Sequence, residues 1–298
     1  MSVRILQFGA TGQLAREMLD RAGGAVRVTA LSRADVDLTD PAAVRRAIET
    51  AGEVDLVVNA AGYTNVDKAE SEPDLAYAVN ARAPEMMARA CQARGLPFVH
   101  ISTDMVFSGA KQGPYIETDL PAPLSVYGAS KLMGEQAVLA ACDRALVGRV
   151  TWLFSAYGHN FLQIMLRLAR TQPALKVVED QRGRATASGD VAGFLIGQAG
   201  RLAKAPAGAP EWGLLHLVQP ESATRLEMAK ALFDLAGVDA PPIEPVPTSA
   251  FPTPARRALN AELDCTRLND VFGVTLRPWR EALADVVAKI KQNEGALA

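Results

Sequence analysis

The sequence predicts an α/β fold built on a parallel, doubly wound sheet, because short apolar runs alternate with longer amphipathic segments through its first half. The apolar runs are rich in β-branched and aliphatic residues and lack polar alternation, which is typical of strands buried on both faces. Strands that alternate with helices form βαβ units, in which consecutive strands lie parallel. The predicted strands are 3–8, 26–31, 54–59, 98–102 and 145–150, and the predicted helices are 13–22, 41–51, 73–94 and about 125–141.

Capping signals support these helix boundaries. Asp40-Pro41 places a capping carboxylate directly before a proline at the first position of the second helix. Gly95-Leu96-Pro97 stops the long third helix, since glycine favours the turn after a helix and proline cannot continue one. These signals fix where the helices start and stop more firmly than hydrophobic periodicity alone.

The second half of the chain has a less regular pattern. Six prolines between Pro241 and Pro254 exclude a helix in that segment and favour an extended wall or lid. Residues 204–210 form a small-residue surface loop. The other expected elements are helices at 160–171, 188–203, 222–236, 266–272 and 278–291, and short strands at 175–178 and 214–218.

Composition and charge exclude several classes of protein. A chain of 298 residues that is 49% hydrophobic can bury an ample core. Its 31 basic and 33 acidic side chains nearly balance, so the chain has no net electrostatic attraction to nucleic acid. Cys91, Cys142 and Cys265 are too dispersed for a disulfide framework. The sequence has neither a signal-like N-terminus nor an apolar run long enough for a bilayer. We therefore expect a cytoplasmic protein without nucleic-acid or membrane partners.

The first strand ends in a glycine-rich turn, Gly9-Ala10-Thr11-Gly12-Gln13-Leu14-Ala15, where the first helix begins. Two glycines three apart let the backbone approach a pyrophosphate at the positive N-terminus of the helix. The place of the turn, at the first strand–helix junction, favours dinucleotide binding over an ordinary connection. We therefore expect a Rossmann-type dinucleotide-binding domain over residues 1–155, with cofactor contacts from Gly9, Thr11, Gly12, Gln13 and Leu14.

The second strand ends in Ser32 and Arg33, without the acidic residue that would bind a ribose 2′-hydroxyl. Both side chains can contact a 2′-phosphate, and a guanidinium suits that contact. The alternative is that Arg33 is merely solvated. We expect NADP(H) to be preferred, with NAD(H) left open, and Asp37 and Leu38 to lie along the adenine.

Tyr127 and Lys131 stand four residues apart on a predicted helix and therefore face the same way. A lysine ammonium near a phenol stabilises the phenolate and lowers its pKa from about 10 toward the working range. Thr103 sits at the carboxyl end of the fourth strand, where ligands bind in such sheets, and can hydrogen-bond a substrate carbonyl. We expect these three residues to be catalytic.

These motifs resemble the extended short-chain dehydrogenase/reductase superfamily, whose Ser/Thr-Tyr-Lys triad matches Thr103, Tyr127 and Lys131. Within it, the chain resembles the dTDP-4-dehydrorhamnose reductase family along nearly its whole length. Two segments are specific to this branch: Val-Asp-Lys-Ala-Glu at 66–70 and Pro-Thr-Pro-Ala-Arg at 252–256. The other matching segments are 9–14, 59–65, 102–107, 127–135, 160–161, 180–181 and 247–251.

The resemblance implies reduction of the C4 keto group of a nucleotide-linked 6-deoxy sugar by a nicotinamide cofactor. Tyr127 would give the proton to the oxygen, and Lys131 would hold the nicotinamide ribose. Ala60, Ala61 and Tyr63 would line the cofactor, and Arg256 would pair with the substrate diphosphate. The residues implied at the sugar are Thr64, Val66, Met105, Trp152 and Asn160. A smaller, mainly substrate-binding lobe is expected over 156–298, with some segments returning to the Rossmann core.

Three departures from the family pattern bear on the site. Met105 replaces the tyrosine usual in the Ser-Thr-Asp-Tyr-Val-Phe motif, which removes a hydroxyl near the sugar. Residues 149–155 read Arg-Val-Thr-Trp-Leu-Phe-Ser, where the family commonly has Thr-Ser-Trp-Val-Tyr-Gly. Some members hold magnesium at a dimer contact through glutamates. Only Glu17 clearly matches that set, and Gly189 replaces another member of it, so no metal is predicted.

Two other hypotheses stay open from the sequence. Met105 favours a related nucleotide-sugar reductase or epimerase that acts on a different sugar. The same fold also serves as a non-catalytic, NADP-binding regulatory subunit of methionine adenosyltransferase, a role that has no need of a tuned tyrosine. The expected partner is a small-molecule nucleotide sugar, and a homodimer is left open.

Overall fold

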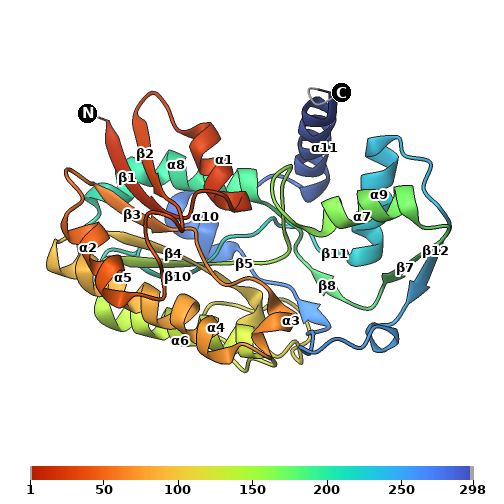
Figure 1. Cartoon of the computed structure of the whole chain (residues 1–298), viewed down its shortest axis with the longest axis horizontal. Coiled ribbons are helices and arrows are strands. Elements are labelled where there is room, and N and C mark those ends of the chain that lie inside the picture. The colour runs from red at the N-terminus through yellow and green to blue at the C-terminus, as the bar shows by residue number, and fades with distance from the viewer. Residues whose placement is uncertain (1, 296–298) are drawn as a thin grey trace.

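Six strands form one parallel sheet in the computed structural model, which describes residues 2–295 (Figure 1). Residue 1 and residues 296–298, the outer ends of the two expected domains, lie outside the described residues. The strand order is β10-β5-β4-β3-β1-β2. The bounds are β1 Val3–Phe8, β2 Val26–Leu31, β3 Leu56–Asn59, β4 Phe98–Thr103, β5 Ala145–Val150 and β10 Gly213–His216. The predicted doubly wound α/β fold is confirmed.

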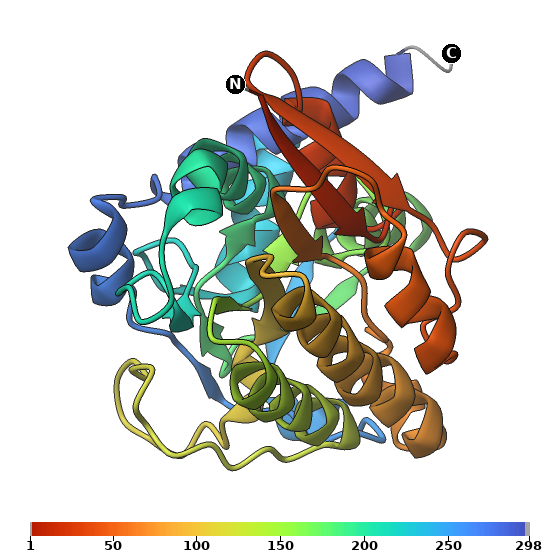
Figure 2. The same cartoon turned by 90° about the vertical axis from the view of Figure 1, so that its left-hand side faces the viewer.

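Helices cover both faces of this sheet (Figure 2). Alternate residues of a strand point to opposite faces. Ile5 accordingly joins a core cluster with Leu14 and Met18 of the first helix. Leu6 joins another cluster with Ile48 and Met87. The helices are α1 Gln13–Arg21 and α8 Ser188–Lys204 on one face, and α2 Pro41–Glu49, α5 Ala83–Ala93 and α6 Val126–Ala141 on the other.

The chain reverses its winding direction between β1 and β3, which flank one another with β2 on the far side of β1. Connections from the carboxyl ends of these two strands diverge to opposite faces of the sheet. A crevice for ligands forms at such a switch point in open α/β sheets. The glycine-rich turn after β1 lies at this point.

The predicted helix at 73–94 is wrong in one respect, because it is interrupted. It consists of α4 Pro73–Tyr77, a π-helical turn Ala78–Arg82, and α5. Pro84 has no N–H to donate and its ring crowds the carbonyl of the residue four positions earlier, Asn80. The wider π-turn accommodates this conflict, and π-turns frequently occur at functional sites.

The second half forms a smaller lobe on the right of Figure 1. It also returns to the sheet, to which it adds the edge strand β10 and the covering helix α8. In this lobe β7 Leu175–Val178 pairs in parallel with β12 Ile243–Val246, so the proline-rich segment is partly an extended strand, with a 3-10 turn at Thr248–Ala250. The remaining elements are α3 Val66–Ala69, β6 Leu153–Phe154, α7 Phe161–Thr171, β8 Arg182–Gly183, β9 Thr186–Ala187, β11 Ala223–Thr224, α9 Arg225–Ala236, β13 Asn260–Ala261, α10 Thr266–Phe272 and α11 Trp279–Gly295.

The lobe has its own hydrophobic core, in which side chains of α7, α9 and α11 pack together. Trp279 at the start of α11 is almost fully buried there. Across residues 2–295, no helix combines the length and the apolar character needed to cross a membrane.

Candidate active site

Helix α6 carries two of the predicted catalytic residues and lies against the end of β4. Ser125 caps the helix, since its hydroxyl accepts a hydrogen bond from Gly128 N at 3.1 Å. A Cβ at Gly128 would collide with the carbonyl oxygen of Met105, in the turn directly after β4. Only glycine therefore allows α6 to approach this closely, and the approach brings Tyr127 beside Thr103.

Thr103 and Asp104 are buried together at the end of β4. The Thr103 hydroxyl donates to Asp104 Oδ1 at 3.0 Å and accepts from Met105 N at 3.2 Å. Burial raises the pKa of Asp104 to about 6, although hydrogen bonding to Thr103 and the charge of Arg225 lower it. Sequence reasoning missed Asp104 as a site residue, although it directly follows Thr103 in the same motif.

Tyr127 holds its proton firmly in this environment. Burial and then the nearby charge of Asp104 raise its pKa to about 12, while hydrogen bonding to Thr103 opposes the shift. The protonated phenol is the form that a reduction needs, because the carbonyl oxygen must receive a proton.

The ammonium of Lys131 is buried behind Tyr127, along β4. Its Nζ donates to Ile101 O at 2.6 Å and lies 3.3 Å from His100 Nε2. Burial lowers its pKa to about 8, against the opposing charge of Glu135. The expected lowering of the Tyr127 pKa by Lys131 is not found, because burial and Asp104 dominate at the phenol.

The glycine-rich turn is shaped for close approach of a ligand. Gly9 has φ +98°, and a Cβ there would lie 3.2 Å from Ala61 N. Helix α1 begins after Gly12 without a side-chain cap, so its first N–H groups need an outside acceptor. A pyrophosphate supplies such acceptors, and these residues therefore fit a dinucleotide. Thr11 is exposed, Gln13 is half-buried and Leu14 is buried.

The turn after β2 contains a carboxylate that sequence reasoning missed. Asp35 Oδ2 accepts hydrogen bonds from Ser32 N at 2.8 Å and from Ser32 Oγ at 2.6 Å. The only signal for it is the spacing of three residues between serine and aspartate, which is common in turns. Arg33 is exposed and Leu38 is half-buried. The Asp37 carboxylate accepts hydrogen bonds from the backbone N–H and the hydroxyl of Thr39.

The loop after β3 is held by Asn80, another residue that sequence reasoning missed. Asn80 Oδ1 accepts from Tyr63 N at 2.8 Å, and its Nδ2 donates to Tyr63 O at 3.0 Å and to Ser130 Oγ at 3.1 Å. Asn80 thus ties the Ala60–Tyr63 loop to α6 from inside the π-turn. The Tyr63 hydroxyl is engaged by Glu72 at 2.8 Å.

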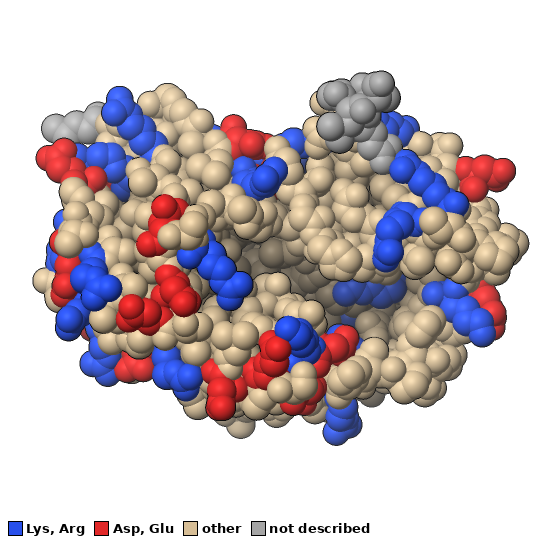
Figure 3. Space-filling model, in the orientation of Figure 1, with Lys and Arg blue, Asp and Glu red and all other residues tan. Residues whose placement is uncertain are grey.

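A cavity of about 380 Å³ lies in the smaller lobe. In the space-filling view, a hollow separates that lobe from the sheet half, and lysine and arginine side chains border it (Figure 3). The cavity walls combine aromatic and cationic side chains. The lining residues are Asn160, Phe161, Ile164, Met165, Lys176, Val177, Val178, Gln181, Arg225, Phe251, Thr253 and Arg257.

Arg225 links this cavity to the catalytic residues. Its guanidinium lies 3.8 Å from the ring centre of Trp152 and 5.0 Å from that of Phe161. Burial lowers its pKa to about 10, and the charge of Asp104 raises it, so Arg225 stays a cation at neutral pH. Trp152 has φ 47° and is the one non-glycine residue with positive φ among residues 2–295. Such strain persists where the surrounding structure fixes it, often at ligand sites.

The other expected substrate residues lie in different surroundings. Thr64 is exposed, whereas Val66, at the start of α3, and Met105, beside Thr103, are half-buried. Arg256 is exposed and does not line the cavity, whereas the neighbouring Arg257 does. Arg257 also pairs with Asp67 at 2.9 Å.

Asn160 lines the cavity, but its amide is used inside the protein. Its Oδ1 accepts from Leu162 N and Gln163 N and so caps α7. Its Nδ2 contacts Gln13 Oε1 and the carbonyls of Ser155 and Tyr157. The polar atoms of Asn160 therefore position the loop beside α1 and are not free for a substrate.

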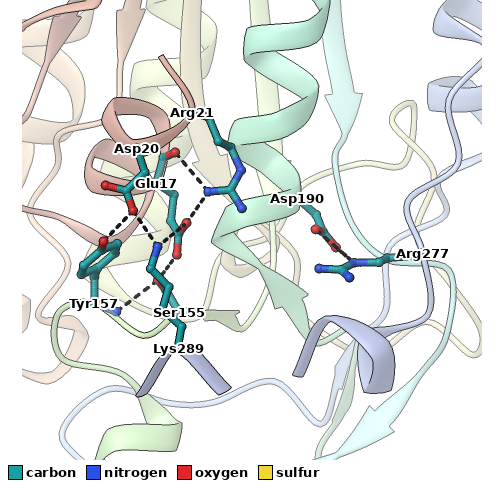
Figure 4. Close-up of polar contacts among 8 residues, drawn as sticks. All are labelled: Glu17, Asp20, Arg21, Ser155, Tyr157, Asp190, Arg277 and Lys289. Carbon is teal, nitrogen blue, oxygen red and sulfur yellow. Dashed lines mark hydrogen bonds and ion pairs between the residues drawn. The ribbon is translucent and has the colours of Figure 1, made fainter. Parts of the chain in front are cut away.

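The surroundings of Glu17 do not fit a magnesium ion. Its carboxylate is bound by Arg21, accepts from Ser155 Oγ at 2.5 Å and lies 3.7 Å from Lys289 Nζ (Figure 4). A Cβ at Gly189 would lie 2.5 Å from the Arg21 guanidinium, so a side chain there would displace Arg21 from its present position. Asp190, the residue directly after Gly189 in the first turn of α8, is bound to Arg277 at 3.0 Å. Cations of the chain itself already neutralise these acids.

Comparisons with known proteins agree along the whole length. The family model described as "RmlD substrate binding domain" matches residues 3–292. The dTDP-4-dehydrorhamnose reductase of Mycobacterium tuberculosis is 41% identical over 294 residues, with 96% of this chain and 93% of that protein covered. A crystal structure of the Clostridium acetobutylicum dTDP-4-dehydrorhamnose reductase superposes with a TM-score of 0.90 at 33% identity, with 97% of this chain and 100% of that chain covered.

The Bacillus anthracis dTDP-4-dehydrorhamnose reductase, solved in complex with NADP, superposes with a TM-score of 0.89 at 29% identity. The match covers 97% of this chain and 100% of that chain. The similarity thus extends over both the sheet and the smaller lobe with its cavity.

Proposed function

The chain belongs to the dTDP-4-dehydrorhamnose reductase family, and on that premise we propose that it reduces the C4 keto group of dTDP-4-dehydrorhamnose at the end of β4. It is an NAD(P)H-dependent oxidoreductase of dTDP-rhamnose biosynthesis. The observation that carries the proposed mechanism is Tyr127, which hydrogen-bonds Thr103 at the end of β4 and keeps its proton because burial and the charge of Asp104 raise its pKa to about 12.

Each catalytic residue then has a role set by its surroundings. Bound at the switch point, a reduced nicotinamide would supply the hydride. Tyr127 donates its phenolic proton to the carbonyl oxygen, and Thr103 orients that oxygen. Lys131 would hold the nicotinamide ribose. Gly9, the uncapped start of α1 and the Ala60–Tyr63 loop bind the rest of the cofactor.

The cavity in the smaller lobe binds the nucleotide diphosphate. Arg225 is a half-buried cation stacked on Trp152, so its N–H groups are pre-oriented for phosphate oxygens. Arg257 lies on the same wall and adds a second guanidinium. Phe161 and Phe251 offer flat surfaces for the base. The family resemblance implies Arg256 for this contact, but Arg256 is exposed and does not line the cavity, so the proposal gives the contact to Arg225 and Arg257.

NADP(H) is the preferred cofactor in this proposal, and NAD(H) is accepted. The carboxylate of Asp35 is turned onto Ser32, which leaves the exposed Arg33 to meet a 2′-phosphate. Replacing Arg33 with alanine should raise the KM for NADPH about tenfold or more and leave that for NADH nearly unchanged. Arg27→Ala, at an exposed position earlier in β2, is the matched control.

Three further assignments belong to the same proposal. Residues 1–155 bind mainly the dinucleotide and residues 156–298 mainly the sugar nucleotide, with α8 and β10 completing the sheet. The cytoplasm is the proposed place of action, and a homodimer is left open. The ion-pair cluster of Glu17 with Arg21 and Lys289, called the Glu17 cluster below, has no part in the chemistry.

The direct test follows NADPH and NADH oxidation by the purified protein with freshly prepared dTDP-4-dehydrorhamnose. Turnover that requires this substrate and is faster with NADPH supports the proposal. Tight cofactor binding with no turnover would instead favour a regulatory role. Turnover only with a nucleotide sugar of another configuration would favour altered specificity through Met105.

A further inference from the structure

A chain of buried polar contacts extends from the cofactor loop to Lys131. Asn59 Oδ1 accepts from Ala61 N at 3.1 Å, and Asn59 Nδ2 lies 3.1 Å from His100 Nδ1. His100 Nε2 in turn lies 3.3 Å from Lys131 Nζ. Asn59 and His100 have no exposed surface, and Lys131 is nearly buried. Water therefore does not compete with these contacts, and their directions are set within the protein.

The donors and acceptors in this chain determine which ring nitrogen of His100 carries the proton. Because Asn59 Oδ1 is used by the Ala61 N–H, the amide group that faces the ring is the Nδ2 donor. His100 Nδ1 must then accept, so the proton of the neutral imidazole is on Nε2. Burial and the charge of Lys131 keep the pKa of His100 well below its usual range, which excludes the imidazolium.

An Nε2–H that faces Lys131 Nζ forms a hydrogen bond only with the lone pair of the uncharged amine. We propose that His100 is a positioning residue for the reduction, which donates its Nε2–H to Lys131 and so favours the amine over the ammonium. This inference rests on the proposed role of Lys131 beside Tyr127. A lysine that exchanges its proton near the working pH suits a site in which Tyr127 must be reprotonated after each turnover.

The other charged groups around Lys131 do not prevent its pKa from being lowered. Glu135, one turn further along α6, raises the pKa of Lys131. However, Arg149 of β5 binds both oxygens of Glu135, at 2.9 and 2.6 Å. Burial lowers the pKa of Lys131 against this charge, and the pairing of Glu135 with Arg149 weakens the opposition.

The first test compares pH–rate profiles of reduction for two variants. His100→Phe removes the N–H and keeps an aromatic ring against Phe98. His100→Gln can place an amide N–H near the position of Nε2. We expect the alkaline limb, on which Lys131 loses its proton, to move up by about one pH unit in His100→Phe, the size expected for one hydrogen bond. His100→Gln should retain the wild-type profile. An unchanged or lowered limb in His100→Phe would overturn the proposal.

The second test needs neither a variant nor substrate. Nitrogen NMR of protein labelled at histidine reports which ring nitrogen carries the proton for each of the three histidines. We expect His100 to be neutral and protonated at Nε2 from pH 6 to 9. A proton on Nδ1, or an imidazolium, would refute the inference. Because this measurement does not depend on turnover, its failure is distinct from failure of the proposed reaction.

Discussion

The two walls of the active site are assembled from the chain in different ways. The catalytic wall consists of one strand end and one helix: Thr103 closes β4, and Tyr127 and Lys131 share a face of α6. The cavity wall contains Arg225, from the start of α9, which is held in place by its stack on Trp152, from the β5–β6 connection. Local spacing is sufficient to build the first wall, whereas the second exists only when distant segments meet.

This difference predicts how each wall responds to substitution. On the catalytic wall, loss of the Tyr127 hydroxyl should affect the rate of the chemical step and leave ligand binding intact. On the cavity wall a change should affect substrate binding and leave cofactor binding intact. Asp104 lies where the walls meet, because it accepts a hydrogen bond from Thr103 and its charge also acts on Arg225.

The largest effect is expected for Tyr127→Phe. It removes only the proton donor, so kcat should fall about 10²- to 10⁴-fold while the affinity for NADPH stays unchanged. Tyr157→Phe is the matched control, because its hydroxyl bonds Asp20, away from the proposed reaction centre. Steady-state kinetics with a cofactor titration measure both quantities. A near wild-type kcat in Tyr127→Phe would show that Tyr127 is not the proton donor.

Arg225→Met should be the strongest change on the cavity wall. Loss of a half-buried cation that pairs with a bound diphosphate costs about 2–5 kcal/mol, or about 30- to several-thousand-fold in kcat/KM for the sugar nucleotide. Arg256→Met, at an exposed neighbour of the cavity, should change it less than about threefold. If the Arg256 variant showed the larger loss, the diphosphate would lie elsewhere than in this cavity.

Asp104→Asn tests the junction of the two walls through stability. Burial raises the pKa of Asp104 from its ordinary 3.8 to about 6 in the folded protein. Its contribution to stability is therefore fully present below pH 3.8 and is lost as the pH rises through 6. The variant should be more stable than the wild type at pH 8, by up to about 3 kcal/mol, and of similar stability near pH 4. Urea unfolding at both pH values measures this, and an equal difference at both would contradict the assignment.

The smallest effect is expected for Lys289→Met, away from both walls. Lys289 joins α11 to Asp20 of α1 at 2.6 Å through a partly exposed ion pair. Such pairs contribute less than about 1 kcal/mol and are screened by salt. Thermal unfolding in low and high salt should show a small loss that disappears at high ionic strength. A loss that persists in salt would assign the Glu17 cluster a larger structural role.

The same contrast explains what the sequence could predict. The bounds of β1, β2 and β5 and the capped start of α2 were predicted correctly, because apolar runs and capping residues are local signals. The π-turn before Pro84 was not predicted, since its geometry also depends on the fit of Asn80 against Tyr63 and α6.

Residues of the candidate site divide in the same way. The family motif drew attention to Arg256, yet the side chain that lines the cavity is that of Arg257, because backbone direction decides between neighbours. Arg225 has no motif around it and is recognised only by its stack on Trp152. Asp35 and Asp104 were likewise visible only once their hydrogen-bond partners were in place.

The central claim is that Tyr127 and the cavity together direct reduction to C4 of the sugar. The most direct measurement supplies dTDP-4-dehydrorhamnose with NADPH deuterated at the transferred position of the nicotinamide and locates the label by NMR. The account predicts deuterium at C4 of the 6-deoxyhexose in the wild-type product, formed far more slowly by Tyr127→Phe. Deuterium at another carbon, or cofactor oxidation that leaves the sugar unlabelled, would contradict it.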